Sequence, residues 1–326
     1  MHKPKTLVNC PPDASFLHVL DPIRDRAEFL IGNQPEFVRE HTPEAEVILV
    51  SGMTGRALTL REIWPLAKNV RWVHSLSAGV ENLLFPELIE SPVPVTNARG
   101  VFKRSLAEFA VLGMLYFYKQ VRRLVESQRQ GKWDQFLVEW IPGRTMGIVG
   151  YGEIGQECAL LAKAMGMRIV ATRRRPELAV GDALLDRAYP LGDLHSMLQE
   201  CDVVVLAAPS TPETFHIIGE AELRSMKKSA ILINIGRGVL VDEPQLVRAL
   251  KEGWIAAAAL DVFEKEPLPP DHPFWAMENV LLSPHCTDRT KYPDWLELTT
   301  LQFVQNFERY LKGEPLQHVV DKNAGY

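Results

Sequence analysis

The sequence has few cysteines, little net charge and no long hydrophobic run, and each of these absences excludes a class of protein. Its four cysteines lack the paired spacing of a metal site, and in 326 residues they do not form the disulfide framework of a small secreted domain. Lysine and arginine total 36 and aspartate and glutamate 41, so the net charge of −5 offers no field to hold nucleic acid. The most apolar stretches, such as residues 254–260, are too short to span a membrane.

The N-terminal sequence MHKPKTLVNCPPD also lacks the charged and then apolar segments of a secretory signal. These features predict a cytoplasmic protein without a metal site, and with neither nucleic acid nor a membrane among its partners. With 46% hydrophobic and 24% charged residues the composition is that of a globular protein, and 326 residues are enough for two domains.

Short apolar runs alternate with longer helical patterns along most of the chain. Strands buried on both faces are predicted at residues 47–50, 70–74, 146–150, 168–172, 203–207, 230–234 and 256–260. This alternation is typical of α/β architecture with parallel sheets. Residues 105–130 indicate one long helix that ends at Gly131, and residues 292–313 are mostly helical. Because the alternation is unbroken over 145–261 and looser before about residue 101, we expect one domain to be inserted in the other.

Gly150, Gly152 and Gly155 form a GxGxxG pattern between a predicted strand and a helix expected from about Gln156 to Ala164. That context is typical of a turn that binds the pyrophosphate of a dinucleotide. The first glycine tightens the turn, the second lets backbone amides approach the phosphates, and the third lets helix and strand pack closely. The alternative, a glycine-rich loop that only turns the chain, does not require the flanking strand and helix.

The residues after the next strand indicate which dinucleotide is preferred. NAD enzymes usually carry an acidic residue there, about 20 residues on, that binds the ribose 2′-hydroxyl. This chain has Arg173, Arg174 and Arg175 instead, and guanidinium groups can form bidentate bonds to a 2′-phosphate. The sequence therefore favours NADP over NAD. The alternative is a solvated basic turn, since arginines are common on surfaces.

Five ordered motifs give the chain a resemblance to the D-isomer-specific 2-hydroxyacid dehydrogenases. They are GYGEIG at 150–155, LAAPSTPET at 206–214, INIGRGVLVDE at 233–243, ALDVFEKEPLP at 259–269 and NVLLSPH at 279–285. The resemblance covers nearly the whole chain and implies two Rossmann-like doubly wound α/β domains. A dinucleotide-binding domain over residues 102–286 would be inserted in a discontinuous substrate domain of residues 1–101 and 287–326.

The same resemblance implies the catalytic residues. It places the arginine that binds the substrate carboxylate at Arg237, the acid that supports the histidine at Glu266 and the proton-relay histidine at His285. Keto-acid reduction needs a proton donor that cycles near neutral pH, as histidine does, and a neighbouring carboxylate stabilises the charged imidazole. Taken singly, each residue also has a purely structural interpretation. Arg237 could be a surface arginine, Glu266 a turn residue, and His285 a histidine whose hydrogen bonds serve only the fold. The glycines beside Arg237 and Pro284 before His285 favour loops beyond strand ends, where open α/β sheets bind ligands.

Further contacts are implied by the resemblance. Those to the cofactor involve the glycine turn with Glu153 and Ile154, then Arg173, Arg174, Pro209, Ile235 and Asp261. Asp261 would border the nicotinamide carboxamide, or else cap a strand end. The backbone amides of Ala78 and Gly79 are implied for the substrate carboxylate. After His285 the family usually has small residues, whereas this chain has Cys286, Thr287, Asp288 and Arg289. Cys286 is either a reactive thiol beside the histidine or a compact buried residue, and we expect the second, with no catalytic role.

These observations predict an NADPH-linked reductase of a small 2-keto acid, or 2-hydroxyacid dehydrogenase, with glyoxylate and hydroxypyruvate as the leading substrates. The resemblance further implies a homodimer built largely by the dinucleotide-binding domain and its first long helix. The alternative on the same fold is a nucleotide-sensing binding protein that dimerises, of the corepressor type. Turnover of NADPH distinguishes the two.

Overall fold

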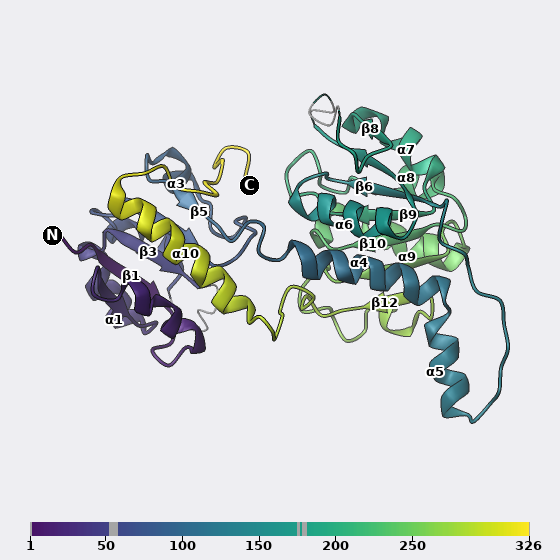
Figure 1. Ribbon diagram of the computed structural model, residues 1–326, viewed down its shortest axis with the longest axis horizontal. Helices are drawn as coiled ribbons and strands as arrows, with labels where there is room; N and C mark the ends of the chain where they lie inside the picture. Colours follow the sequence, from purple (N-terminus) through teal and green to yellow (C-terminus); the bar gives the residue numbers. More distant parts are fainter. Residues whose placement is uncertain (1, 52–57, 175–176, 178–180, 326) are drawn as a thin grey trace. The chain divides into compact units, whose positions relative to one another are not determined.

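The computed structural model describes residues 2–51, 58–174, 177 and 181–325, and the chain folds into two compact units (Figure 1). Unit 1 comprises Met1–Phe102 and Arg289–Tyr326, and unit 2 comprises Lys103–Asp288. The second unit is thus inserted in the sequence of the first.

Unit 1 is built on a five-stranded sheet in which all pairs are parallel. The strands are β1 (Lys5–Asn9), β2 (Glu28–Ile31), β3 (Val47–Val50), β4 (Trp72–Ser75) and β5 (Val95–Thr96). Their order, β2-β1-β3-β4-β5, is a doubly wound order of the flavodoxin kind. The helices are α1 (Pro35–His41), α2 (Leu60–Ile63), α3 (Pro86–Glu90) and α10 (Trp295–Lys312), with 3-10 turns η1 (Ser15–Ile23), η2 (Thr42–Glu44) and η3 (Trp64–Leu66).

The last helix, α10, returns the chain to the core of unit 1. Asp294 caps its first turn through two backbone amides, and the helix ends at Gly313, whose φ of 69° is left-handed. Phe303 of α10 is fully buried and stacks on Trp72 of β4, with ring centroids 5.2 Å apart. This aromatic contact explains why the segment after unit 2 is part of unit 1.

Unit 2 is built on a seven-stranded sheet, again with parallel pairs throughout. The strands are β6 (Thr145–Val149), β7 (Arg168–Thr172), β8 (Arg187–Tyr189), β9 (Val203–Leu206), β10 (Ile231–Asn234), β11 (Ala257–Leu260) and β12 (Val280–Leu282). Their order, β12-β11-β10-β9-β6-β7-β8, is the Rossmann order with one added strand, and the winding reverses between β6 and β9.

Helices cover both faces of this sheet. α4 (Lys103–Tyr118) packs against α6 (Glu153–Ala164) and against β10 and β11. Side chains of α7 (Leu194–Glu200), α8 (Glu220–Ser225) and α9 (Glu243–Glu252) join the strands in a second buried cluster. The 3-10 turns are η5 (Leu191–Asp193), η6 (Gly238–Leu240) and η7 (Pro273–Ala276). The predicted α/β class, with two Rossmann-like doubly wound domains, is confirmed.

The prediction of one long helix over 105–130 is wrong. α4 ends at Tyr118, and α5 (Val121–Arg129) is a separate helix because Gln120 has a left-handed φ of 51°. The side-chain amide of Gln120 donates to the carbonyl oxygen of Leu137, which holds the break in place. Gly131, with a φ of 61°, follows the end of α5 as predicted. Figure 1 shows α5 and the segment after it projecting from the rest of unit 2.

Two negative findings concern the described residues only. Within them, every helix is either too short or too polar to cross a membrane. The same residues contain no cluster of three or more His, Cys, Asp or Glu side chains that could hold a metal ion.

Candidate active site

Three neighbouring strands of unit 2 each lead into a loop with one predicted catalytic residue. Arg237 follows β10, Glu266 follows β11 and His285 follows β12. Since β10, β11 and β12 are adjacent and parallel, their carboxyl ends lie at the same edge of the sheet. Open α/β sheets bind their ligands at this edge.

Glu266 and His285 are in direct contact. Glu266 Oε2 lies 2.6 Å from His285 Nδ1, and Glu266 Oε1 accepts a hydrogen bond from the backbone N–H of Phe263 at 3.0 Å. Because an ionised carboxylate can only accept a hydrogen bond, the Nδ1 atom of His285 must carry a proton. The Nε2 atom lies on the side of the ring away from Glu266. The side chains of Glu266 and His285 are 34% and 41% exposed, so both are open to solutes.

The main chain at His285 has an unusual conformation that Asp261 supports. His285 has a φ of 50°, which is uncommon for a residue other than glycine and persists only where its surroundings fix it. The side chain of Asp261, 1% exposed, accepts from Cys286 N–H at 3.1 Å and from Thr287 Oγ1 at 2.5 Å. The His285 N–H donates to the Asp261 carbonyl at 2.9 Å. Asp261 thus caps the strand end, one of its two predicted roles.

The loop of Arg237 is shaped by a buried asparagine. Asn234, 1% exposed, donates from Nδ2 to the Arg237 carbonyl at 2.9 Å and accepts from Gly236 N–H at 3.1 Å. Arg237 itself is half-buried, and its Nη1 donates to the Gly236 carbonyl at 2.7 Å. The last residue of β10 therefore determines how the chain turns toward Arg237.

Gly238 joins the loop of Arg237 to the loop of Glu266. A Cβ at Gly238 would lie 1.9 Å from the carbonyl carbon of Phe263 and 2.4 Å from the nitrogen of Glu264. Both neighbours are main-chain atoms, so the two loops are in backbone contact that only glycine permits.

The glycine turn lies at the carboxyl end of β6, where the sheet reverses its winding toward β9. Gly150 has a φ of 95°, and a Cβ there would lie 2.6 Å from the backbone nitrogen of Ala208, just after β9. A Cβ on Gly155 would lie 2.5 Å from the Gly150 carbonyl oxygen. The left-handed φ of Gly150 fits the tight turn expected of the first glycine, and the close approach at Gly155 fits the packing of helix and strand expected of the third.

Gly152 has a different environment, and it bears on whether a dinucleotide fits. Among the described residues, none has an atom within 4 Å of a Cβ placed on Gly152, so this part of the main chain borders open space. Gly152 precedes the 12-residue helix α6, whose first amides, including those of Glu153 and Ile154, have no side-chain cap. Open space beside uncapped amides at a helix N-terminus fits a pyrophosphate.

The predicted basic cluster follows β7. Arg173 is half-buried, and its backbone N–H donates to the carbonyl of Tyr189 in β8 at 2.9 Å. Arg174 is exposed. Arg175 lies outside the described residues. The described part of this turn thus carries two guanidinium groups where an NAD-binding turn carries a carboxylate.

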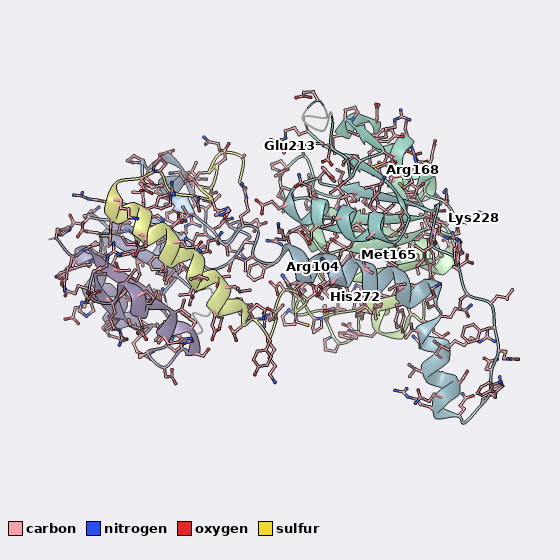
Figure 2. All side chains as sticks on the ribbon, viewed as in Figure 1. Arg104, Met165, Arg168, Glu213, Lys228 and His272 are labelled. Carbon is pink, nitrogen blue, oxygen red and sulfur yellow. The ribbon has the colours of Figure 1, made fainter. Side chains whose placement is uncertain are left out.

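Both arginines influence the pKa of a neighbouring side chain. Burial raises the pKa of Tyr151, in that turn, and the charge of Arg173 opposes the rise. Glu213, in the loop after β9 and labelled in Figure 2, has a lowered pKa because of a hydrogen bond with Thr211, with a smaller contribution from Arg174. Arg173 therefore contributes positive charge at the glycine turn, and Arg174 does so at the loop after β9.

The other predicted contacts lie at strand ends in both units. In unit 2, Pro209 follows β9 and Ile235 follows β10; the Ile235 N–H donates to the Leu206 carbonyl at 3.2 Å. In unit 1, Ala78 and Gly79 follow β4, and the Ala78 carbonyl accepts from Asn97 at 2.6 Å.

One expectation is wrong, and several residues had no predicted role. Cys286 is exposed rather than buried, and its backbone rather than its thiol binds Asp261. Asn234, Glu243 and Glu264 also shape the loops of this edge. All three belong to the motifs quoted above, which was the only sequence signal for them.

Comparison with known proteins agrees with this architecture. Residues 111–287 match the model of the NAD binding domain of D-isomer specific 2-hydroxyacid dehydrogenases. Glyoxylate reductase of Aeropyrum pernix is 41% identical over 237 residues, which cover 69% of this chain and 69% of that protein. A 2-hydroxyacid dehydrogenase of Xanthobacter autotrophicus, solved with NADPH, has a TM-score of 0.84 at 26% identity, and all of both chains is covered. The NADPH-dependent glyoxylate/hydroxypyruvate reductase of Sinorhizobium meliloti has a TM-score of 0.84 at 25% identity, also over all of both chains. The chain therefore belongs to the D-isomer specific 2-hydroxyacid dehydrogenase family.

Proposed function

We propose that this member of the family is a reductase of small 2-keto acids that prefers NADPH, with glyoxylate or hydroxypyruvate as its substrate. The observation that carries the proposal is the 2.6 Å contact of Glu266 with His285, at the sheet edge that also bears the loop of Arg237. When bound, the reduced nicotinamide supplies the hydride. The residues of the chain must bind the acid, orient it and supply the proton.

Each of the three residues has one task in this proposal. Arg237 holds the substrate carboxylate with two charge-assisted bonds and polarises the adjacent carbonyl. His285 gives the proton on Nε2 to the carbonyl oxygen as the carbon is reduced, which yields the 2-hydroxy acid. Glu266 keeps the Nδ1 proton and stabilises the charged imidazole before the transfer.

Unit 2 is the dinucleotide-binding domain in this proposal. The backbone amides of Glu153, Ile154 and Gly155 hold the pyrophosphate, and Arg173 and Arg174 hold the 2′-phosphate. Pro209 and Ile235 would border the rest of the cofactor, whereas Asp261, which caps the strand end, would act through the loop of His285. Unit 1 is the substrate domain, and the backbone amides of Ala78 and Gly79 are its proposed contribution to binding the acid.

The relatives guide the choice of substrate. The similar protein of Aeropyrum pernix is a glyoxylate reductase, and that of Sinorhizobium meliloti is an NADPH-dependent glyoxylate/hydroxypyruvate reductase. Both acids have a carboxylate next to the reducible carbonyl, the arrangement that a single arginine can bind and polarise.

A panel of acids tests the function. We expect the purified protein to oxidise NADPH with glyoxylate and hydroxypyruvate, faster than with NADH, as measured by loss of the absorbance of the reduced nicotinamide. Glycolaldehyde, which has the carbonyl without the carboxylate, is the control and should react far more slowly. Tight binding of NADPH without turnover on any acid would instead favour the nucleotide-sensing protein.

Replacement of Arg173 by alanine tests the basis of cofactor preference. We expect the Kd for NADPH to rise about 10- to 100-fold, because this is the usual effect of losing a hydrogen bond to a charged group. The Kd for NADH should be nearly unchanged. Fluorescence titration measures both constants. Arg24→Ala, at an exposed arginine of unit 1 paired with Asp21, is the control. An equal effect on both cofactors would show that Arg173 does not bind the 2′-phosphate.

We also propose that the protein is a homodimer that uses the projecting segment after α5. This segment exposes Trp133, Leu137 and Trp140, at 90%, 91% and 74% of their surfaces. It is held in place by Arg123 of α5, which donates to both carboxylate oxygens of Asp134 at 2.7 and 3.0 Å. An ordered apolar surface of this kind is typical of a protein interface, and a two-fold contact between copies would cover it.

A further inference from the structure

The loop of Glu266 is held by a second glutamate that has no role in the chemistry proposed above. The Glu264 N–H donates to Glu243 Oε1 at 2.7 Å, and the Glu243 N–H donates to Glu264 Oε1 at 3.1 Å. Each residue thus binds the backbone of the other through its side chain. This Glu243–Glu264 clasp joins the loop after β11 to the first turn of α9.

The clasp is one peptide group away from the bond that shapes the proposed catalytic carboxylate. Of two consecutive amides, that of Phe263 donates to Glu266 and that of Glu264 donates to Glu243. The Glu266 carboxylate in turn contacts His285 through its other oxygen. A movement of the main chain at Glu264 therefore moves the amide that orients Glu266.

Two histidines support the clasp from other loops. His216 Nε2 lies 2.9 Å from Glu264 Oε1. His272, labelled in Figure 2, accepts the Phe274 N–H at Nδ1, so its Nε2 carries the hydrogen and faces Glu243 Oε2 at 3.6 Å. Both carboxylates of the clasp thus have a polar neighbour besides each other.

Glu243 of the clasp is also close enough to Glu266 for their charges to interact. Glu243 is only 9% exposed, and burial is the main reason that its pKa is raised. The bond from the Glu264 N–H opposes the rise, whereas the charges of Glu264 and Glu266 add to it. A buried carboxylate near two others is unfavourable without such bonds, so the clasp is what makes the arrangement stable.

We propose that Glu243 is a positioning residue: by accepting the Glu264 N–H, it holds the main chain of residues 263–266 so that Glu266 meets His285. The inference rests on the proposed function, in which Glu266 and His285 form the proton-donating pair. Glu243 does not touch the substrate, and its effect on turnover passes through the loop.

Two substitutions at one position separate the hydrogen bond from the charge. Glu243→Ala removes the acceptor, whereas Glu243→Gln removes the charge and keeps a side-chain oxygen. For alanine we expect kcat to fall about 10- to 100-fold, as for a small displacement of a reacting group, with KM and the Kd for NADPH little changed. Glutamine should restore most of kcat. Glu252→Ala, on the same helix and paired with Arg248 at the surface, is the matched control.

Hydrogen exchange measured by mass spectrometry gives a readout that does not depend on turnover. In Glu243→Ala, the peptide spanning residues 261–267 should exchange faster, with the rest of unit 2 unchanged. Unchanged exchange and unchanged kcat would overturn the inference, as would glutamine acting like alanine, or faster exchange throughout unit 2. If the wild-type protein turned over no keto acid, exchange would still decide whether the clasp holds the loop, and only the proposed function would fail.

Discussion

Replacement of His285 by alanine is expected to lower kcat about 10²- to 10⁴-fold, the usual contribution of a general acid. The Kd for NADPH should stay close to that of the wild type. The reason is the distance across the sheet: His285 follows β12, whereas the glycine turn follows β6, and β11, β10 and β9 lie between them. Steady-state kinetics with glyoxylate, combined with fluorescence titration of NADPH, measures both quantities.

The protein contains a matched control for this substitution. His195 of α7 contacts Glu222 at 3.0 Å in another histidine–glutamate pair, and the His195 side chain is 51% exposed. It lies outside the proposed active site, so His195→Ala should leave kcat and the Kd for NADPH unchanged. Comparable losses of turnover and NADPH binding in His285→Ala would indicate misfolding rather than loss of a proton donor.

Replacement of Gly238 by alanine should have the largest effect on stability, about 3 kcal/mol or more. The added Cβ would lie 1.9 Å from a carbonyl carbon, so the loops of Arg237 and Glu266 must separate. We therefore expect kcat to fall as well, even in the fraction that remains folded. Urea unfolding followed by circular dichroism gives the change in free energy, and kinetics below the transition gives kcat.

Gly192→Ala is the appropriate control for Gly238→Ala. A Cβ on Gly192 would meet nothing within 4 Å, and this glycine has no left-handed φ. The change in unfolding free energy should therefore be small or slightly favourable, because alanine restricts the unfolded chain. If Gly238→Ala lowered the unfolding free energy no more than Gly192→Ala, the two loops would not be in backbone contact.

The sequence pattern identified central strands better than edge strands. All seven predicted strands are present, with ends within two residues of the prediction. The missed strands β2, β5, β8 and β12 are the four edge strands of the two sheets. β2, β8 and β12 are short and only partly buried, whereas β5 is buried but has only two residues. The missed strand β1 is central, but its apolar run is only Leu7 and Val8 between polar residues, too short to stand out.

Contacts distant in sequence account for what local patterns could not predict. The break at Gln120 depends on a hydrogen bond to Leu137, which is 17 residues away. The helical pattern of the local sequence therefore gives no indication of the break. Within the site, the glycine turn followed from its strand and helix, whereas Arg237, Glu266 and His285 needed the family resemblance. Glu243 and Glu264 lie in two of the family motifs, but nothing in the motifs indicates that the two residues meet. Charge alone would keep two glutamates apart, and only backbone amides bring them together.

The contact at Gly238 also limits how this enzyme can change over time. Because the atoms facing Gly238 are the carbonyl carbon and oxygen of Phe263, no choice of side chain at position 263 makes room for a larger residue at 238. Gly147 differs, because its nearest neighbour is the Sγ atom of Cys201, which a second mutation can shorten or remove. Second-site suppressors should therefore be obtainable for substitutions at Gly147, whereas those at Gly238 are rescued only by reversion.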